Sequence, residues 1–171
     1  TFDLVTLGQL LLRLSPPNNE RLMRCDVFEK QVGGAELNVA VGVSLLGLHT
    51  GIISKIPSHD IGSFMKGKIR SYGVSDDFFI YDKSPSARVG IYYYENGAYP
   101  RKPKVIYDRA NSSFYSIKID EIPEEVYSAT KCFHTSGITL ALNPQIRKTA
   151  IEMIKRFKEA GTLVSFDVNF R

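Results

Sequence analysis

Apolar runs and amphipathic stretches alternate along the N-terminal part of the chain. Residues 2–7 form a short apolar run closed by a glycine, which predicts a buried strand, and residues 10–14 continue in extended form until a Ser-Pro-Pro stop. A Gly-Gly pair opens the almost wholly apolar stretch 35–48, which predicts a buried helix. Residues 50–55 predict a second strand, and residues 60–72 place apolar side chains at helical spacing. The predicted order is strand, helix, strand, helix.

The middle of the chain has a different character, because β-branched and aromatic residues dominate residues 78–107. A turn-forming stretch at 95–103 separates two such runs, which predicts a β-hairpin. The alternation then returns as helix, strand, helix and strand over residues 124–129, 131–135, 144–160 and 162–167. Strands that alternate with helices predict an α/β fold with a parallel sheet, here interrupted by an inserted antiparallel piece.

Composition places the chain among globular proteins, with 43% hydrophobic and 23% charged residues and a net charge of +4. The isoelectric point near 9.0 raises the question of nucleic acid binding. However, the basic residues are dispersed, and the densest cluster, residues 101–104, lies in a proline-containing turn. We interpret this cluster as a solvated loop and expect no nucleic acid partner.

The cysteines and the hydropathy of the chain indicate the cellular compartment of the protein. Cys25 and Cys132 lie far apart, and neither has a second thiol or a histidine at ligand spacing, so neither a zinc site nor a disulfide framework is indicated. The apolar N-terminal stretch is broken by Asp3 and Arg13, and no run approaches the roughly 18 apolar residues of a membrane span. We expect a cytoplasmic protein without a membrane anchor.

The Gly33-Gly34 pair is the first candidate for chemistry. Absent side chains and free N–H groups at a helix start can receive a hydroxyl or a carboxylate, although a tight loop-to-helix turn needs such glycines as well. Asn38, one turn into the apolar helix, must find a partner if it is buried, and a ligand hydroxyl or a neighbouring backbone group would serve.

The hairpin and the C-terminal segment supply further candidates. Tyr92, Tyr107 and Arg109 can clamp a carboxylate, or they can form an aromatic cross-strand cluster with a surface arginine. Residues 167–171 put an acid, an amide and a guanidinium at alternate positions where the chain leaves the sheet, a pattern hard to explain as packing. Neither a dinucleotide fingerprint nor a P-loop occurs, and no histidine has partners for a triad.

Several motifs together resemble the ribokinase-like carbohydrate kinases over the entire chain: GGAELNVAVGVSLLGL, IPSHDIGSFMKGKIRSYGV and DVNFR. Within that family, RVGIYYYE, VIYDRANSSF and HTSGITLAL resemble the 2-keto-3-deoxygluconate kinases. The resemblance implies a ribokinase-like, Rossmann-type parallel sheet flanked by helices, with a β lid around residues 78–109. It also implies phosphorylation of a sugar acid that uses ATP and Mg2+.

The resemblance assigns roles to individual positions. It implies that the acceptor site contains Gly34, Ala35, Asn38, Tyr92, Tyr107, Arg109 and Ile138. Asn169 matches a residue near the nucleotide phosphates and their Mg2+, and Arg171 would reach both the sugar acid and the transferred phosphoryl group. The outer face of the lid is often a dimer contact in the family.

Two departures from the family pattern stand out. Gln9 occupies a position that is commonly acidic, which leaves the contact made from that position open. The Gly-Ala-Gly-Asp element, which carries the anion hole and the catalytic base of the family, does not occur before the chain ends at Arg171, directly after a predicted strand. We therefore expect residues 1–171 to be the N-terminal part of one longer α/β domain, inactive alone.

Two other hypotheses remain open. A truncated ribokinase-like body can serve as a sugar-acid-binding module without catalysis, and a different kinase of the family would act on fructose or ribose. A neutral sugar has no carboxylate for Arg109 to bind, so the Tyr-x-Arg element favours an acidic acceptor. Nothing in the motifs separates 2-keto-3-deoxygluconate from its galactonate epimer.

Overall fold

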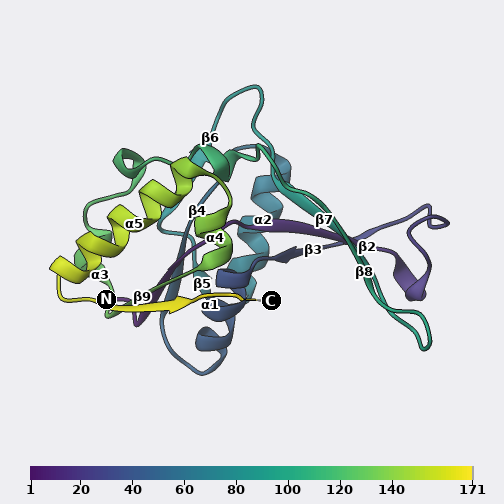
Figure 1. The fold of residues 1–171 in the computed structure, drawn as a ribbon, viewed down its shortest axis with the longest axis horizontal. Helices are drawn as coiled ribbons and strands as arrows, with labels where there is room; N and C mark the ends of the chain where they lie inside the picture. Colours follow the sequence, from purple (N-terminus) through teal and green to yellow (C-terminus); the bar gives the residue numbers. More distant parts are fainter. Residues whose placement is uncertain (171) are drawn as a thin grey trace.

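A computed structural model describes residues 1–170 of the chain as two β-sheets with flanking helices (Figure 1). The larger sheet forms the body of the protein, and its strands follow the order β10-β9-β1-β4-β5, with β6 also paired to β4. All of these pairings are parallel. The strands are β1 (Leu4–Leu7), β4 (Thr50–Pro57), β5 (Val74–Ser75), β6 (Phe79–Asp82), β9 (Cys132–Ser136) and β10 (Leu163–Asp167).

Hydrophobic clusters cover both faces of the central strands of this sheet, whereas Leu163 in the edge strand β10 is 68% exposed. In β4, Ile52 belongs to one cluster and its neighbour Ile53 to the other, because successive side chains of a strand point to opposite faces. A strand buried on both faces reads as an unbroken apolar run, which is why the sequence pattern located β1 and β4 correctly. The flanking helices are α1 (Ala35–Leu45), α2 (Asp60–Ser71), α3 (Val126–Ala129), α4 (Gly137–Ala141) and α5 (Pro144–Glu159).

Helix α5 shows how local sequence sets an element. The Asn143 side chain accepts a hydrogen bond of 2.7 Å from the Ile146 N–H and so caps the first turn. One face of the helix is fully buried, and Gly161, with φ of 79°, follows the last turn. Helix α1 differs from the expectation of a buried helix, because its C-terminal end is open, with Leu45 77% exposed and Leu46 82% exposed.

The smaller sheet projects from the body as a lid (Figure 1, right). Its order is β3-β2-β7-β8, with antiparallel pairing at both edges and a parallel pair in the centre. The strands are β2 (Leu11–Ser15), β3 (Glu29–Gly33), β7 (Gly90–Glu95) and β8 (Lys104–Asp108). The inserted hairpin β7–β8 therefore joins a second, N-terminal hairpin to make one four-stranded sheet.

The lid begins later in the hairpin region than residue 78, the expected boundary. Strand β6 belongs to the larger sheet, where Phe79 packs in one hydrophobic cluster and Ile80 lies against the other. Side chains that are buried on both faces require a covered sheet, and this requirement places residues 79–82 in the body. Among residues 1–170, no helix combines the length and apolar character needed to cross a lipid bilayer.

Candidate functional site

A cavity of about 290 Å³ lies between the lid and the N-terminal end of α1. Three strands of the lid, the first turn of α1 and helix α4 contribute side chains to it. It brings together all seven residues of the described chain that the family resemblance assigns to the acceptor site: Gly34, Ala35, Asn38, Tyr92, Tyr107, Arg109 and Ile138. Side chains more than 100 residues apart in the sequence thus converge on one place.

Strand register explains the polar wall of the cavity. Arg13 in β2 lies beside Tyr92 in β7, and Tyr92 lies opposite Tyr107 in β8. Residues in such a row share one face of the sheet, and here that face is the cavity wall. The rings of Tyr92 and Tyr107 are 5.9 Å apart and tilted by 35°. The two phenols therefore form one continuous surface.

Gly34 meets a steric requirement of the chain itself. Its φ is 150°, and a Cβ at this position would lie 2.7 Å from the Gln9 carbonyl oxygen. At Gly33, a Cβ would lie 2.5 Å from the Tyr92 hydroxyl. Gly34 is therefore required for the turn, whereas Gly33 leaves room for the Tyr92 hydroxyl, and an approach of the sugar to the Gly34 backbone stays a prediction.

The polar side chain that α1 buries is Glu36, which sequence reasoning missed. Asn38 is exposed at the cavity, so it needs no partner within the protein. Glu36 is 2% exposed, and its Oε1 accepts hydrogen bonds from Ser136 Oγ at 2.6 Å and Thr139 Oγ1 at 2.7 Å. The signal in the sequence was an acid in the first turn of an apolar helix, a position that the helix dipole favours.

The Glu36 hydrogen bonds have a structural consequence for the cavity. These hydrogen bonds connect the first turn of α1 to α4, the short helix that contains Ile138. Ile138 then supplies an apolar side chain opposite the polar lid. Glu36 is therefore a positioning residue, since both hydroxyls that it binds belong to the segment that places Ile138.

Arg109 is held at the base of the lid by Gln9. Its Nε and Nη2 donate to Gln9 Oε1 at 3.0 and 2.6 Å, and Gln9 Nε2 donates to Ser112 Oγ at 2.7 Å. Gln9 is 3% exposed, so its amide is a buried, fixed acceptor. An amide orients the guanidinium without neutralising it, and the positive charge of Arg109 remains available to a ligand. This answers the question that the substitution at position 9 left open.

Charge and burial act in opposite directions on the pKa of Tyr92. Burial raises the pKa of Tyr92, while the neighbouring Arg13 guanidinium lowers it. The phenol is protonated at neutral pH and can donate a hydrogen bond to a ligand oxygen. The cavity also contains one carboxylate, Glu36, whose Oε1 is already bonded to two hydroxyls.

Asn169, a C-terminal candidate within the described residues, does not line this cavity. Asn169 follows β10, has a φ of 52°, and donates its backbone N–H to Asp167 Oδ1 at 2.9 Å. Arg171 falls outside the described residues. His134 is buried with its Nδ1 2.9 Å from Ser165 Oγ, and burial lowers its pKa, as suits a packed residue. Within residues 1–170, no three His, Cys, Asp or Glu side chains gather as a metal site.

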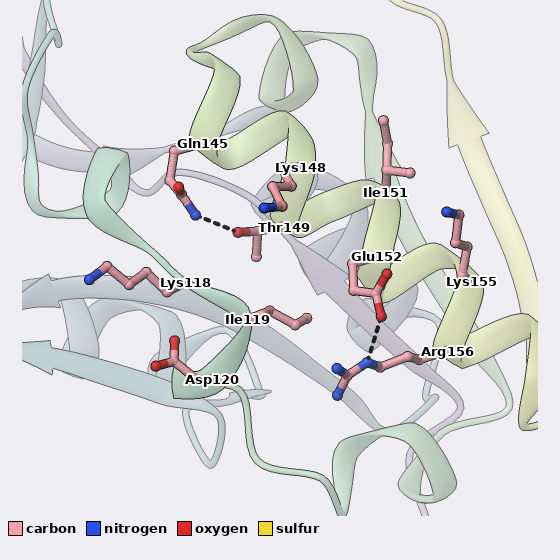
Figure 2. Close-up of a pocket in the computed structure, with 10 residues that line it drawn as sticks. All are labelled: Lys118, Ile119, Asp120, Gln145, Lys148, Thr149, Ile151, Glu152, Lys155 and Arg156. Carbon is pink, nitrogen blue, oxygen red and sulfur yellow. Dashed lines mark hydrogen bonds and ion pairs between the residues drawn. The ribbon is translucent and has the colours of Figure 1, made fainter.

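A second cavity, of about 560 Å³, runs along α5 and the short helical turn Ile119–Glu121 (Figure 2). Figure 2 shows two pairs of its polar groups bound to each other, with Gln145 Nε2 3.3 Å from Thr149 Oγ1 and Arg156 Nε 3.1 Å from Glu152 Oε1. None of the residues predicted to bind a ligand lines it. The smaller cavity is the candidate site, because the predicted side chains converge there.

Comparison with known proteins identifies the family of the chain. The family model described as pfkB family carbohydrate kinase matches residues 1–171. The chain belongs to this family. It is 39% identical over its whole length to a 2-dehydro-3-deoxygalactonokinase of Haloferax volcanii, of which it covers 53%. It therefore spans about half the length of the relatives it matches.

Solved structures of sugar kinases show the same architecture. A 2-dehydro-3-deoxygluconokinase of Thermotoga maritima superimposes with a TM-score of 0.93 at 35% identity, over all of this chain and 52% of that one. An uncharacterized sugar kinase of Pyrococcus horikoshii in complex with ATP has a TM-score of 0.84 at 28% identity, over 98% of this chain and 53% of that one. The ribokinase-like α/β fold predicted from the motifs is confirmed.

Proposed function

We propose that the protein transfers a phosphoryl group from ATP to a hydroxyl of a 2-keto-3-deoxy sugar acid, with 2-keto-3-deoxygluconate and its 6-phosphate as substrate and product. The observation that carries the proposal is the Arg109 guanidinium, fixed by the neutral Gln9 amide beside Tyr107 in a cavity of sugar size. A fixed cation that keeps its charge favours a carboxylate. The names of two relatives also denote kinases of keto-deoxy sugar acids.

The proposal divides the acceptor between the two walls of the cavity. The lid wall, with Arg109, Tyr92 and Tyr107, would bind the carboxylate and neighbouring oxygens. The opposite wall would bind sugar hydroxyls through Asn38 and the backbone at Gly34 and Ala35, with Ile138 against the carbon skeleton; this division extends the roles assigned above. Positioning of this kind supplies much of the rate enhancement in phosphoryl transfer.

ATP would supply the phosphoryl group and Mg2+ would neutralise charge on its phosphates. We place Asn169 and Arg171 toward these phosphates, since Asn169 follows β10 at the carboxyl edge where open parallel sheets bind ligands. The ATP complex of the related sugar kinase supports the choice of nucleotide. The sequence contains no Gly-Ala-Gly-Asp element, so we propose that residues 1–171 supply the acceptor side and do not catalyse alone.

The proposal also covers the cellular location of the protein and its self-association. We place it in the cytoplasm, with self-association through the outer face of the lid. Tyr93 and Ile106 are neighbours on that face, away from the cavity, and Phe28 packs on Tyr93 with ring centres 5.7 Å apart. Ile106 is 44% exposed there, and an apolar surface of this kind suits a contact between copies.

Replacement of Arg109 by alanine in the whole protein tests the proposed function. The fall in kcat/KM for 2-keto-3-deoxygluconate should correspond to a loss of about 2–5 kcal/mol in transition-state stabilisation. This is the range for removing one partner of a buried charge pair. The methyl ester of the same acid, which lacks the charge, should lose far less. Equal losses would mean that Arg109 organises the lid instead of binding the carboxylate. Sugar-acid binding without phosphoryl transfer in the unmutated protein would favour the non-catalytic binding module.

A further inference from the structure

The candidate cavity contains a second guanidinium, from Arg13 in the middle of β2. Its Nε is buried and has no hydrogen-bond partner among the described residues. It also makes no ion pair with a carboxylate of residues 1–170. A buried donor on a charged group costs free energy when it lacks an acceptor. Arg13 therefore brings to the cavity a guanidinium that has no counter-ion within residues 1–170.

Aromatic rings, not acids, surround Arg13. Its guanidinium carbon lies 5.4 Å from the ring centre of Tyr94, and it is the strand neighbour of Tyr92. The cation–π contact orients the guanidinium but leaves its charge in place. Arg13 thus lines the cavity with a positive charge that no carboxylate of the described chain pairs with.

Arg109 provides a contrast within the same cavity. Two of its nitrogens already donate to Gln9 Oε1, so its geometry is fixed by the protein. Arg13 extends from β2 and Arg109 follows the end of β8, so the two cations reach the cavity from opposite edges of the β2-β7-β8 unit. The cavity lining also contains the Glu36 carboxylate, whose Oε1 accepts hydrogen bonds from Ser136 and Thr139.

We propose that Arg13 is a substrate-binding residue that donates hydrogen bonds to the carboxylate of the acceptor sugar acid and shares its charge with Arg109. This inference rests on the proposed function and adds a second cation to it. The charge of Arg13, which no carboxylate of residues 1–170 pairs with, accounts for the choice of an anion, because a hydroxyl would meet a hydrogen bond but not the charge. Arg13 then makes the site selective for acids over neutral sugars.

The test measures KM for 2-keto-3-deoxygluconate and for its methyl ester. It compares the Arg13→Gln and Arg13→Met variants of the whole protein with the unmutated protein. We expect KM for the acid to rise about tenfold or more, while KM for the ester changes by about twofold or less. The melting temperature without ligand should stay constant or rise, because the variants remove a buried donor that lacks a partner. Lys102→Gln, an exposed cation of the lid outside the cavity, is the matched control and should change neither KM.

The outcomes separate this proposal from the proposed function. Equal losses for acid and ester, or a lower melting temperature together with both losses, would show that Arg13 supports the lid through Tyr94, and would overturn its role in binding. If Arg109→Ala removes the preference for the acid while Arg13→Gln keeps it, the proposed function stands and the role of Arg13 fails. If the unmutated protein does not prefer the acid to its ester in calorimetric binding, the carboxylate site itself is wrong, and the role of Arg13 falls with it.

Discussion

The two sheets of this protein use the same kind of strand for different purposes. In the body, Val5 and Phe133 are fully buried and hydrophobic clusters cover both faces of the central strands. In the lid, β8 is exposed along its whole length, and the inner face carries an arginine and three tyrosines. Apolar burial stabilises the body and the base of the lid, where Leu12 is 5% exposed, whereas the cavity face of the lid presents charged and hydrogen-bonding groups. The difference teaches that stability and recognition are separated along one chain.

The largest effect expected from this comparison is the loss of a core ring. Phe133 is fully buried and stacks on Phe157 with ring centres 4.2 Å apart, so Phe133→Ala should lower the free energy of unfolding by about 3–5 kcal/mol. Tyr93→Ala, on the outer face of the lid, is the counterpart and should cost about 1 kcal/mol or less. Denaturant unfolding measures both. Similar losses of unfolding free energy in the two variants would contradict the distinction between a stabilising body and a ligand-binding lid.

An intermediate effect is expected where the body supports the site. Glu36→Ala leaves the buried Ser136 and Thr139 hydroxyls without their acceptor and should cost about 1–3 kcal/mol in unfolding free energy. Glu36→Gln is the control, since its amide oxygen can accept both hydrogen bonds and should restore most of the stability. If alanine and glutamine behave alike, the carboxylate charge matters more than the two hydrogen bonds.

The smallest effect is expected at Gly34, where the body joins the lid. Gly34→Ala places a methyl group against the Gln9 backbone and should cost about 1–2 kcal/mol, with a higher KM because Gln9 holds Arg109. Gly67→Ala, in the exposed middle of α2 with open space around it, should instead stabilise by about 0.5–1 kcal/mol. Unfolding and initial-rate kinetics check both variants. An unchanged melting temperature for Gly34→Ala would mean that the turn relaxes freely.

Sequence reasoning was most accurate where one physical signal dominated. The apolar runs of the body and the amphipathic pattern of α5 predicted their elements closely, because burial on a face imposes a period. Strand β3 was missed because its residues 29–31 are polar and mostly exposed, so no apolar pattern marks it. Strand β6 was assigned to the lid, since a short aromatic run does not reveal which sheet will receive it.

The candidate site shows a similar division. Residues within recognisable motifs, such as Tyr107 and Arg109, were predicted and converge in one cavity, while their assignment to a sugar acid stays a prediction. Arg13 and Glu36 were missed as site residues, because each appears in the sequence as an isolated charge in an apolar segment. Their importance depends on tertiary neighbours: the tyrosines of β7 for Arg13 and the hydroxyls of two residues near α4 for Glu36.

The hydrogen bonds between Gln9 and Arg109 join residues 100 positions apart and close the segment that contains the whole lid. Closing a loop of that length costs chain entropy, and contacts of large sequence separation generally form late in folding. The two hairpins of the lid are local and can form early, but their central parallel pair needs the intervening body strands in place. We therefore expect the folding chain to acquire a native core before it acquires an acceptor-binding cavity.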